Sequence, residues 1–293
     1  MVENGYVKIK DIKPVLSGYL RKTLVLIKKN DVPDEKAIHD IRVFLKKSRA
    51  VMKLIRSQDD TELNKRDLDS LKKAGRLLSD IRDTSVQRKV IKELKKEYPD
   101  LFINLEDNSI IASLMTTGDR QYDQHPEIIL KIKEAEDLLY KTAYRIRFRS
   151  MNDFDPHMLI KELGNAYDKV SGCYLTARSQ SLETNIHEFR KRSKDFLYQL
   201  YFFRPLNPAT VKSLEKKLDS LARNQGRYND LSQLIRSLGY SPGNNNPAAL
   251  DELIIHVRER QDMYMKKIWP AAFKLFCPGT NFINLLGFKI LVI

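Results

Sequence analysis

Cysteine is scarce in this chain of 293 residues, which contains only Cys173 and Cys277. The two form no CxxC motif and no metal-ligand spacing, so we expect free thiols in a reducing compartment. The histidines form no HExxH motif, and no two of them lie four residues apart. Glycine and proline occur 11 times each, and the composition, 42% hydrophobic and 31% charged, is that of a globular protein. We therefore expect neither a bound metal nor a cofactor.

Long apolar runs are also missing. The first residues, MVENGYVKIKDIKP, lack the apolar core of a signal peptide. The last residues, NFINLLGFKILVI, are apolar, but Gly287 and Lys289 interrupt them, and the run is too short to span a bilayer. We expect this tail to dock on the protein or to form a dimer contact. The sequence thus predicts no transmembrane segment and a cytoplasmic location.

Negative charge is under-represented. The chain has 52 Lys and Arg against 38 Asp and Glu, which gives a net charge of +14 and a pI of about 9.5. Such a surplus does not define a fold, but it attracts polyanions such as nucleic acid, an anionic membrane or a phosphate polymer. The length is that of roughly two domain-sized units, enough to bury a sizeable core.

Apolar residues recur at helical spacing through most of the chain, and no convincing run alternates as a strand does. We therefore predict an all-α protein. Segments 100–125 and 239–246 are expected to be irregular, apart from a short helix within NSIIASLMTTG. Asp34, Asp83 and Asp230 are expected to be helix N-caps. The predicted helices are 15–29, 34–56, 62–79, 84–98, 127–149, 156–167 or beyond, 182–203, 208–224, 230–238 and 247–276.

One predicted helix is unusually basic. The stretch AIHDIRVFLKKSRAVMKLIRS, residues 37–57, contains no acid after Asp40. At 100° per residue its cations form a stripe roughly 20 Å long, opposite an apolar face. Like charges four residues apart oppose helix stability by roughly 0.2–0.5 kcal/mol per pair, so a partner helix or a bound anion must supply the counter-charge. The stripe consists of His39, Arg42, Lys46, Arg49 and Lys53.

The head of this helix is repeated later in the chain. AIHDIRVFLKKSR has an echo in NIHEFRKRSKDFL, which places His39 and His187 148 residues apart. Asp83 follows His39 by 44 residues, and Asp230 follows His187 by 43. This matched spacing indicates an internal duplication, with residues 1–150 and 151–293 as two helical bundles related by a pseudo two-fold axis. The second stripe consists of His187, Arg190 and Lys194, with Lys191 alongside and Tyr198 and Tyr201 beyond, which we expect to pack in the core.

The paired motif, together with the later DIRD and YND elements, resembles the CHAD family, the conserved histidine α-helical domain. The resemblance covers nearly the whole chain as a single domain, 1–293. It implies two helical bundles around a basic central groove or pore, and non-enzymatic binding of inorganic polyphosphate. Polyphosphate granules and polyphosphate-metabolising enzymes are the further partners it suggests. The family's histidines and basic positions correspond to His39, Arg42, Lys46, Arg49, Arg82, His187, Arg190 and Lys194.

The second half departs from the first. Asn229 stands where the first half has Arg82, and Arg227 is a possible substitute for that charge. Leu197 and Tyr201 stand opposite Arg49 and Lys53, so the groove is expected to be asymmetric. Four more cations are additional candidates by geometry or position: Lys53, Lys191, Arg76 and Arg223.

Other functions are weighed against this one. Net charge alone favours a protein that binds RNA or another nucleic acid through the backbone, and we expect such binding to be non-specific. The repeated histidines either contact phosphate, which predicts tighter binding near about pH 6 than about pH 8, or are structural. An enzyme of the triphosphate-tunnel type needs an ExExK strand, and a nucleotide enzyme needs a P-loop. Neither motif occurs, nor does a carboxylate cluster for Mg²⁺, so no enzyme activity is expected.

Overall fold

The computed structural model describes residues 11–29, 33–106, 108–116, 126–151, 154–239, 247–280 and 282–286. Within these residues the regular structure is entirely helical, as the sequence predicts. The elements are α1 (Ile12–Lys28), α2 (Glu35–Leu54), α3 (Thr61–Leu77), α4 (Ser79–Glu97), α5 (Pro99–Ile103), α6 (Ser109–Thr116), α7 (Pro126–Phe148), α8 (Pro156–Ser179), α9 (Glu183–Leu200), the 3-10 helix η2 (Tyr201–Phe203), α10 (Pro208–Gly239), α11 (Pro247–Phe276) and α12 (Phe282–Leu286).

Aspartates begin several of these helices. The predicted N-cap Asp34 accepts a hydrogen bond from the Ala37 amide at 2.6 Å. Asp60 caps α3 in the same way, through the Leu63 amide at 2.8 Å. Each cap satisfies an amide that has no partner within its own helix, which is worth about 1 kcal/mol.

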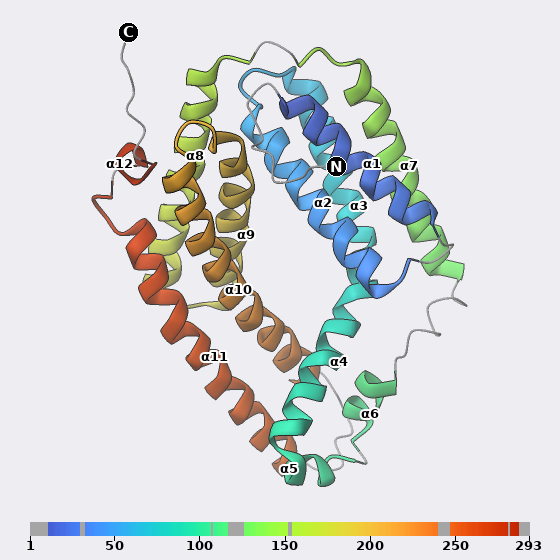
Figure 1. Ribbon diagram of the computed structural model, residues 1–293. Helices are drawn as coiled ribbons and strands as arrows, with labels where there is room; N and C mark the ends of the chain where they lie inside the picture. Colours follow the sequence, from blue (N-terminus) through green and yellow to red (C-terminus); the bar gives the residue numbers. More distant parts are fainter. Residues whose placement is uncertain are drawn as a thin grey trace.

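The helices pack in two groups (Figure 1). The first bundle consists of α1, α2, α3 and α7, and the second bundle of α8, α9, α10 and α11. Helix α2 contacts α9 and joins the two bundles. One continuous apolar core runs through both, and includes Ile41 and Leu45 of α2 and Phe189 and Phe196 of α9. The basic stripes of α2 and α9 are therefore held on helices that anchor the core.

A second apolar cluster lies where α4, α5 and α6 meet the far ends of α10 and α11 (Figure 1). Its fully buried side chains include Ile91, Leu94, Leu234 and Leu253. Helix α4 thus leaves the first bundle and packs against α10 of the second. None of the helices in the described part of the chain has the length and hydropathy of a membrane span.

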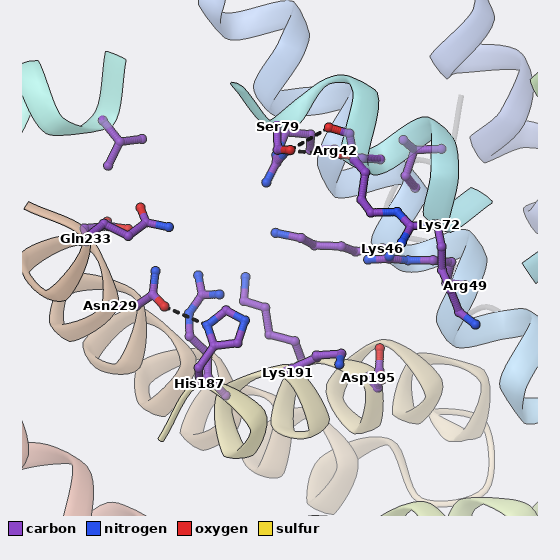
Figure 2. A pocket seen from close by; sticks show the side chains of 17 residues that line it. Arg42, Lys46, Arg49, Lys72, Ser79, His187, Lys191, Asp195, Asn229 and Gln233 are labelled. Atoms are coloured by element: carbon purple, nitrogen blue, oxygen red, sulfur yellow. Dashed lines mark hydrogen bonds between the residues drawn. The ribbon is translucent and has the colours of Figure 1, made fainter. Parts of the chain in front are cut away.

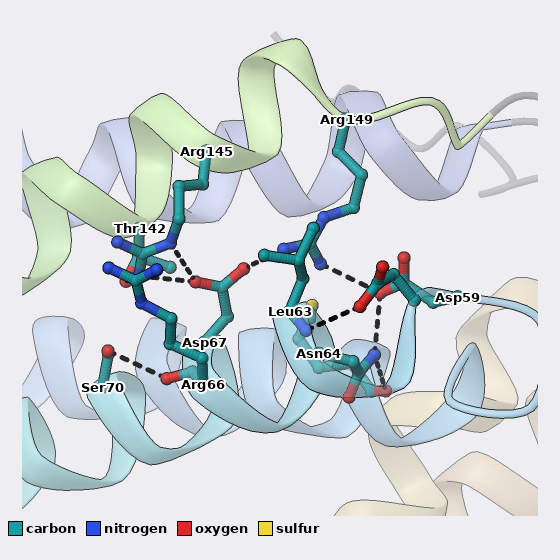
Figure 3. Close-up of polar contacts among 11 residues, drawn as sticks. Asp59, Leu63, Asn64, Arg66, Asp67, Ser70, Thr142, Arg145 and Arg149 are labelled. Atoms are coloured by element: carbon teal, nitrogen blue, oxygen red, sulfur yellow. Dashed lines mark hydrogen bonds and ion pairs between the residues drawn. The ribbon is translucent and has the colours of Figure 1, made fainter.

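A buried polar network ties α3 to α7 (Figure 3). The Asp67 side chain has no exposed surface and bonds both Arg145 and Arg149. Arg149 also reaches Asp59 at 3.0 Å, and Asp59 accepts a hydrogen bond from Asn64. Each of the two buried carboxylates therefore has a cationic partner, which burial of charge requires.

Three predictions about the chain were wrong. Residues 99–103 form the short helix α5, although the segment from 100 was predicted to be irregular. Residues 208–239 form one continuous helix, so no break follows Asn224 and Asp230 lies inside α10. Gly226 and Asn229 are poor helix formers, and both are buried within the continuous helix. Asp83 likewise lies inside α4, which begins at Ser79, and is not an N-cap.

Other predictions are confirmed. The expected short helix in NSIIASLMTTG is α6, and both cysteines are free. Tyr198 is 6% exposed and Tyr201 packs against the core, as expected for packing residues. Helix α8 runs to Ser179, in agreement with a predicted helix from 156 to 167 or beyond. Most of the apolar C-terminal tail lies outside the described residues.

Candidate functional site

A pocket of about 310 Å³ opens between the two bundles (Figure 2). Helices α2 and α3 form one wall, and α9 and α10 form the other. In Figure 2, Lys46 from α2 and Lys191 from α9 point toward each other across it. The lining contains two acids, Asp195 and Asp230. Against them stand eight cations: Arg42, Lys46, Arg49, Lys72, Arg76, Arg190, Lys191 and Lys194.

On α2, burial of the opposite face decides which side chains reach the pocket. Ile38, Ile41 and Val51 are at most 1% exposed and fix the rotation of the helix. Arg42 then reaches α3, where its Nη1 donates to the Gly75 carbonyl at 3.3 Å. Burial lowers the pKa of Arg49 from its ordinary value, and nearby Asp195 opposes that effect. A bound anion would raise the pKa of Arg49, as Asp195 does.

On α9, buried Ile186 and Phe189 fix the helix in the same way. Arg190 lies against α10 at Gly226, where an added Cβ would be 3.5 Å from Arg190 Nη2. Both walls thus place an arginine against a glycine of the neighbouring helix. The absence of a side chain at Gly226 leaves room for the Arg190 guanidinium beside α10.

His187 is oriented by Asn229, which stands where the first half has Arg82. Its Nδ1 lies 2.7 Å from Asn229 Oδ1 (Figure 2). An amide oxygen only accepts, so Nδ1 carries the proton and Nε2 is available to a ligand. His187 is exposed and lines the pocket. Asn229 therefore positions the imidazole, a role that its mismatch with Arg82 did not suggest.

Several cations at the pocket have acidic neighbours. Lys191 pairs with Glu188 at 2.9 Å and Lys72 with Asp69 at 2.8 Å, each three residues away on its own helix. These four side chains are 38–57% exposed, and exposed pairs of this kind contribute little to stability. A polyanion can replace such acidic partners at small cost.

His39 does not line this pocket. It lines a neighbouring hollow of about 580 Å³, which Arg227 also borders. Val86 and Asp230 line both cavities, so the two adjoin. Arg227 also pairs with Glu93 at 3.3 Å. The hollow's further cations are Lys36, Arg88, Lys89 and Lys92.

The remaining predicted site residues lie elsewhere. Lys53 forms an ion pair with Asp195 and is not part of the described lining. Arg223 is 73% exposed and pairs with Asp219 at 3.3 Å. Arg82 belongs to α4, but its side chain lies outside the described residues.

Sequence reasoning missed Lys72 and Gln233, which also line the pocket. Lys72 lies three residues before Gly75, one turn earlier on the same wall. Both α3 and α10 carry a Gly-Arg pair, in AGR (residues 74–76) and QGR (residues 225–227). This pair could have indicated the pocket walls, because Arg42 contacts Gly75 and Arg190 lies against Gly226.

A family model for the CHAD domain matches residues 18–238. The chain belongs to the CHAD family. This CHAD protein is similar to the crystal structure of the CHAD domain from the plant Ricinus communis, with a TM-score of 0.60 and 17% sequence identity. That likeness covers 90% of this chain and 91% of the plant chain, and it supports the all-helical fold. Among curated proteins no match was found.

Proposed function

We propose that this CHAD-family protein binds inorganic polyphosphate in the pocket between α2, α3, α9 and α10, and catalyses no reaction. The observation that carries the proposal is the lining of eight Lys or Arg against two Asp, drawn from both bundles. Polyphosphate is a flexible chain with about one negative charge per phosphate. Arginine suits bidentate contact with phosphate oxygens, and lysine is a mobile point charge. The pocket offers both along facing walls.

The chemistry of the lining favours a ligand without bases. Within the described residues the pocket wall carries no Phe, Tyr or Trp, and its apolar members are Leu45 and Val86. Proteins that bind single-stranded nucleic acid use aromatic rings as stacking platforms for the bases. RNA therefore remains the weaker candidate, held only by charge on its backbone.

Reciprocal contacts between α2 and α9 support the duplication. Lys53 pairs with Asp195, and Lys47 lies 5.8 Å from the Tyr201 ring centroid. A shift of 148 residues, the spacing of the repeat, maps Lys53 onto Tyr201 and Lys47 onto Asp195. The contact of Lys53 with Asp195 in one half therefore corresponds to the contact of Tyr201 with Lys47 in the other. A two-fold axis produces such reciprocity, in which residue i contacts j while j contacts i. We infer one domain of two related halves, 1–150 and 151–293, with the basic groove between them.

A passive binding role agrees with the acids of the site. Asp195 pairs with Lys53, and Asp230 stands on the opposite wall from α2. Neither arrangement resembles the paired carboxylates that hold catalytic Mg²⁺. We infer that the protein acts in the cytoplasm, at polyphosphate granules or beside enzymes that make or use the polymer.

The test compares two variants of equal charge. In the pocket variant Arg42, Lys46, Arg190 and Lys194 become Gln. In the control variant four exposed lysines outside the pocket, Lys65, Lys133, Lys161 and Lys216, become Gln. Affinity for long-chain polyphosphate is measured by titration at two salt concentrations, after circular dichroism shows that both variants are folded.

We expect the pocket variant to bind polyphosphate at least about a hundredfold more weakly, because several charge-assisted hydrogen bonds are lost. Its affinity should also depend less on salt, since fewer counter-ions are released. The control variant should stay near wild type. Equal weakening of the two variants, or equal competition by RNA of the same charge, would contradict the proposal.

A further inference from the structure

Helix α7 exposes a row of aromatic side chains on its outer face. Tyr140, Tyr144 and Phe148 are 59%, 60% and 67% exposed and follow one another at four-residue intervals. The Tyr144 and Phe148 rings are in contact, with centroids 4.9 Å apart. The core side of the same helix is satisfied by Leu139 and Ile146, both fully buried. The aromatic row therefore is not needed for the core, and contiguous apolar surface of this kind marks interaction sites.

An open hollow of about 380 Å³ lies beside this row, between α1 and α7. Leu24 and Val25 of α1 and Tyr140 of α7 form its apolar part, and Val25 is 60% exposed. Arg21, Lys28 and Lys29 complete the lining. The apolar part of this hollow can receive an inserted apolar side chain. The shape favours a protein partner.

The charged residues that line the hollow, Arg21, Lys28 and Lys29, are all basic. Ile12–Lys28 contains no acid, and α7 contains none after Asp137. Lys28 lies over the Tyr140 ring at 5.9 Å and Arg147 lies over Phe148 at 5.6 Å. Two acids, Glu136 and Asp137, lie one turn before Tyr140, and Glu136 pairs with Lys28 at 3.6 Å. The complementary surface is therefore apolar with acidic flanks, which the chain's own residues 1–10, with two lysines and one glutamate, do not provide.

We propose that the outer face of α1 and α7 is the docking site for an acidic amphipathic helix of a partner protein. An apolar side chain of that helix enters the hollow beside Tyr140, and others pack on Tyr144 and Phe148. Its acids face Arg21 and Arg147. Residues four apart share one face of a helix, so the row gives α7 a continuous apolar strip on which a partner helix can pack. The site is independent of polyphosphate binding, because α1 and α7 contribute no described residue to the pocket.

The probe is a labelled synthetic helical peptide of about 18 residues, with leucines along one face and glutamates beside them. Fluorescence anisotropy measures its binding to the full chain. In the test variant Tyr140 and Tyr144 become Ser. In the control variant Leu130, which is 66% exposed on the same helix outside the hollow, becomes Ser. A third protein carries the polyphosphate-pocket substitutions, because an acidic peptide can also bind there.

We expect the peptide to bind wild type, the Leu130 variant and the pocket variant alike, and to bind the Tyr140/Tyr144 variant at least tenfold more weakly. A matched peptide with lysines in place of glutamates should not bind. Arg21→Glu with Arg147→Glu should reverse this preference between the two peptides. The proposal is overturned by loss of peptide binding in the pocket variant, by equal binding to the tyrosine variant, or by absence of peptide binding when anionic vesicles bind the same face.

Discussion

Lys53 of α2 forms an ion pair with Asp195 of α9, across the junction of the two bundles. Asp195 also faces Arg49, whose pKa burial lowers and this carboxylate raises. One acid thus neutralises the end of the basic stripe and lies in the wall of the pocket. It competes there with any anionic ligand. Lys53, the last cation of the α2 stripe, therefore links the two bundles.

Replacing this acid should strengthen ligand binding. We expect Asp195→Asn to tighten polyphosphate binding by about fivefold, because a unit charge at about 4 Å in water is worth about 1 kcal/mol. The same change should destabilise the fold, because Lys53 is half-buried and loses its partner. Titration and urea unfolding measure the two effects. Asp168→Asn, an exposed change outside the pocket, serves as control, and weaker binding by Asp195→Asn would show that the acid does not oppose the ligand.

The network of Asp67 with Arg145 and Arg149 should matter for stability alone. Asp67→Ala leaves two largely buried guanidinium groups without this carboxylate. Breaking a buried pair by removing one partner costs about 3–5 kcal/mol. Asp69→Ala, two residues away and exposed, should change the unfolding free energy by less than about 1 kcal/mol. Urea unfolding measures both, and equal stabilities would mean that the network contributes little.

Two substitutions at Gly226, which contacts Arg190, distinguish an effect on helix stability from an effect on ligand binding. Gly226→Ala puts a Cβ at ordinary contact distance from Arg190 and should stabilise α10 by about 0.5–1 kcal/mol without weakening binding. Gly226→Leu should displace the guanidinium and weaken polyphosphate binding several-fold. Thermal unfolding and titration of the two variants test this. Gly239→Leu, at a position with nothing within 4 Å, is the control.

Helical periodicity predicted much of the fold. The apolar face of α2 is buried, and the spacing of Arg42, Lys46 and Arg49 places all three in one pocket wall, because residues three and four apart share a helix face. The repeat predicted the second wall through Arg190 and Lys194. Local spacing is sufficient for such features.

Features that depend on contacts between distant helices could not be predicted. Lys53 shares the face of Arg49, yet Asp195, 142 residues away, pairs with it. His39 heads the stripe, but it lies beyond Val86 in the adjoining hollow. The polar stretch from Asn224 to Asp230 looked like a turn, and it stays helical because Gln225 and Asn229 are buried between neighbouring elements. Packing decided each of these.

Tyr198 should make the protein sensitive to alkali. Burial raises the pKa of Tyr198 to about 12, above the ordinary value of about 10. The unfolded chain therefore loses this proton first, and the stability that is complete below about pH 10 is lost between about pH 10 and about pH 12. Between pH 9 and pH 11 the unfolding free energy of Tyr198→Phe should fall by about 1 kcal/mol less than that of wild type, as measured by urea unfolding. The exposed Tyr140→Phe should follow wild type, and identical curves for all three would show no such coupling.

The hydrogen bond between His187 and Asn229 leads to a pH dependence of ligand binding. With Nδ1 bound to Asn229, Nε2 is the ring atom available to a phosphate oxygen, and a bound polyanion favours the charged form of a neighbouring histidine. We expect polyphosphate to bind several-fold more tightly at pH 6 than at pH 8. His187→Gln should remove most of that difference, and Asn229→Ala should reduce it because the ring is no longer oriented. His157→Gln, an exposed change at the start of α8, should keep the wild-type pH dependence. If all four proteins responded to pH alike, the imidazole of His187 would have no direct contact with phosphate, and the cations alone would account for binding.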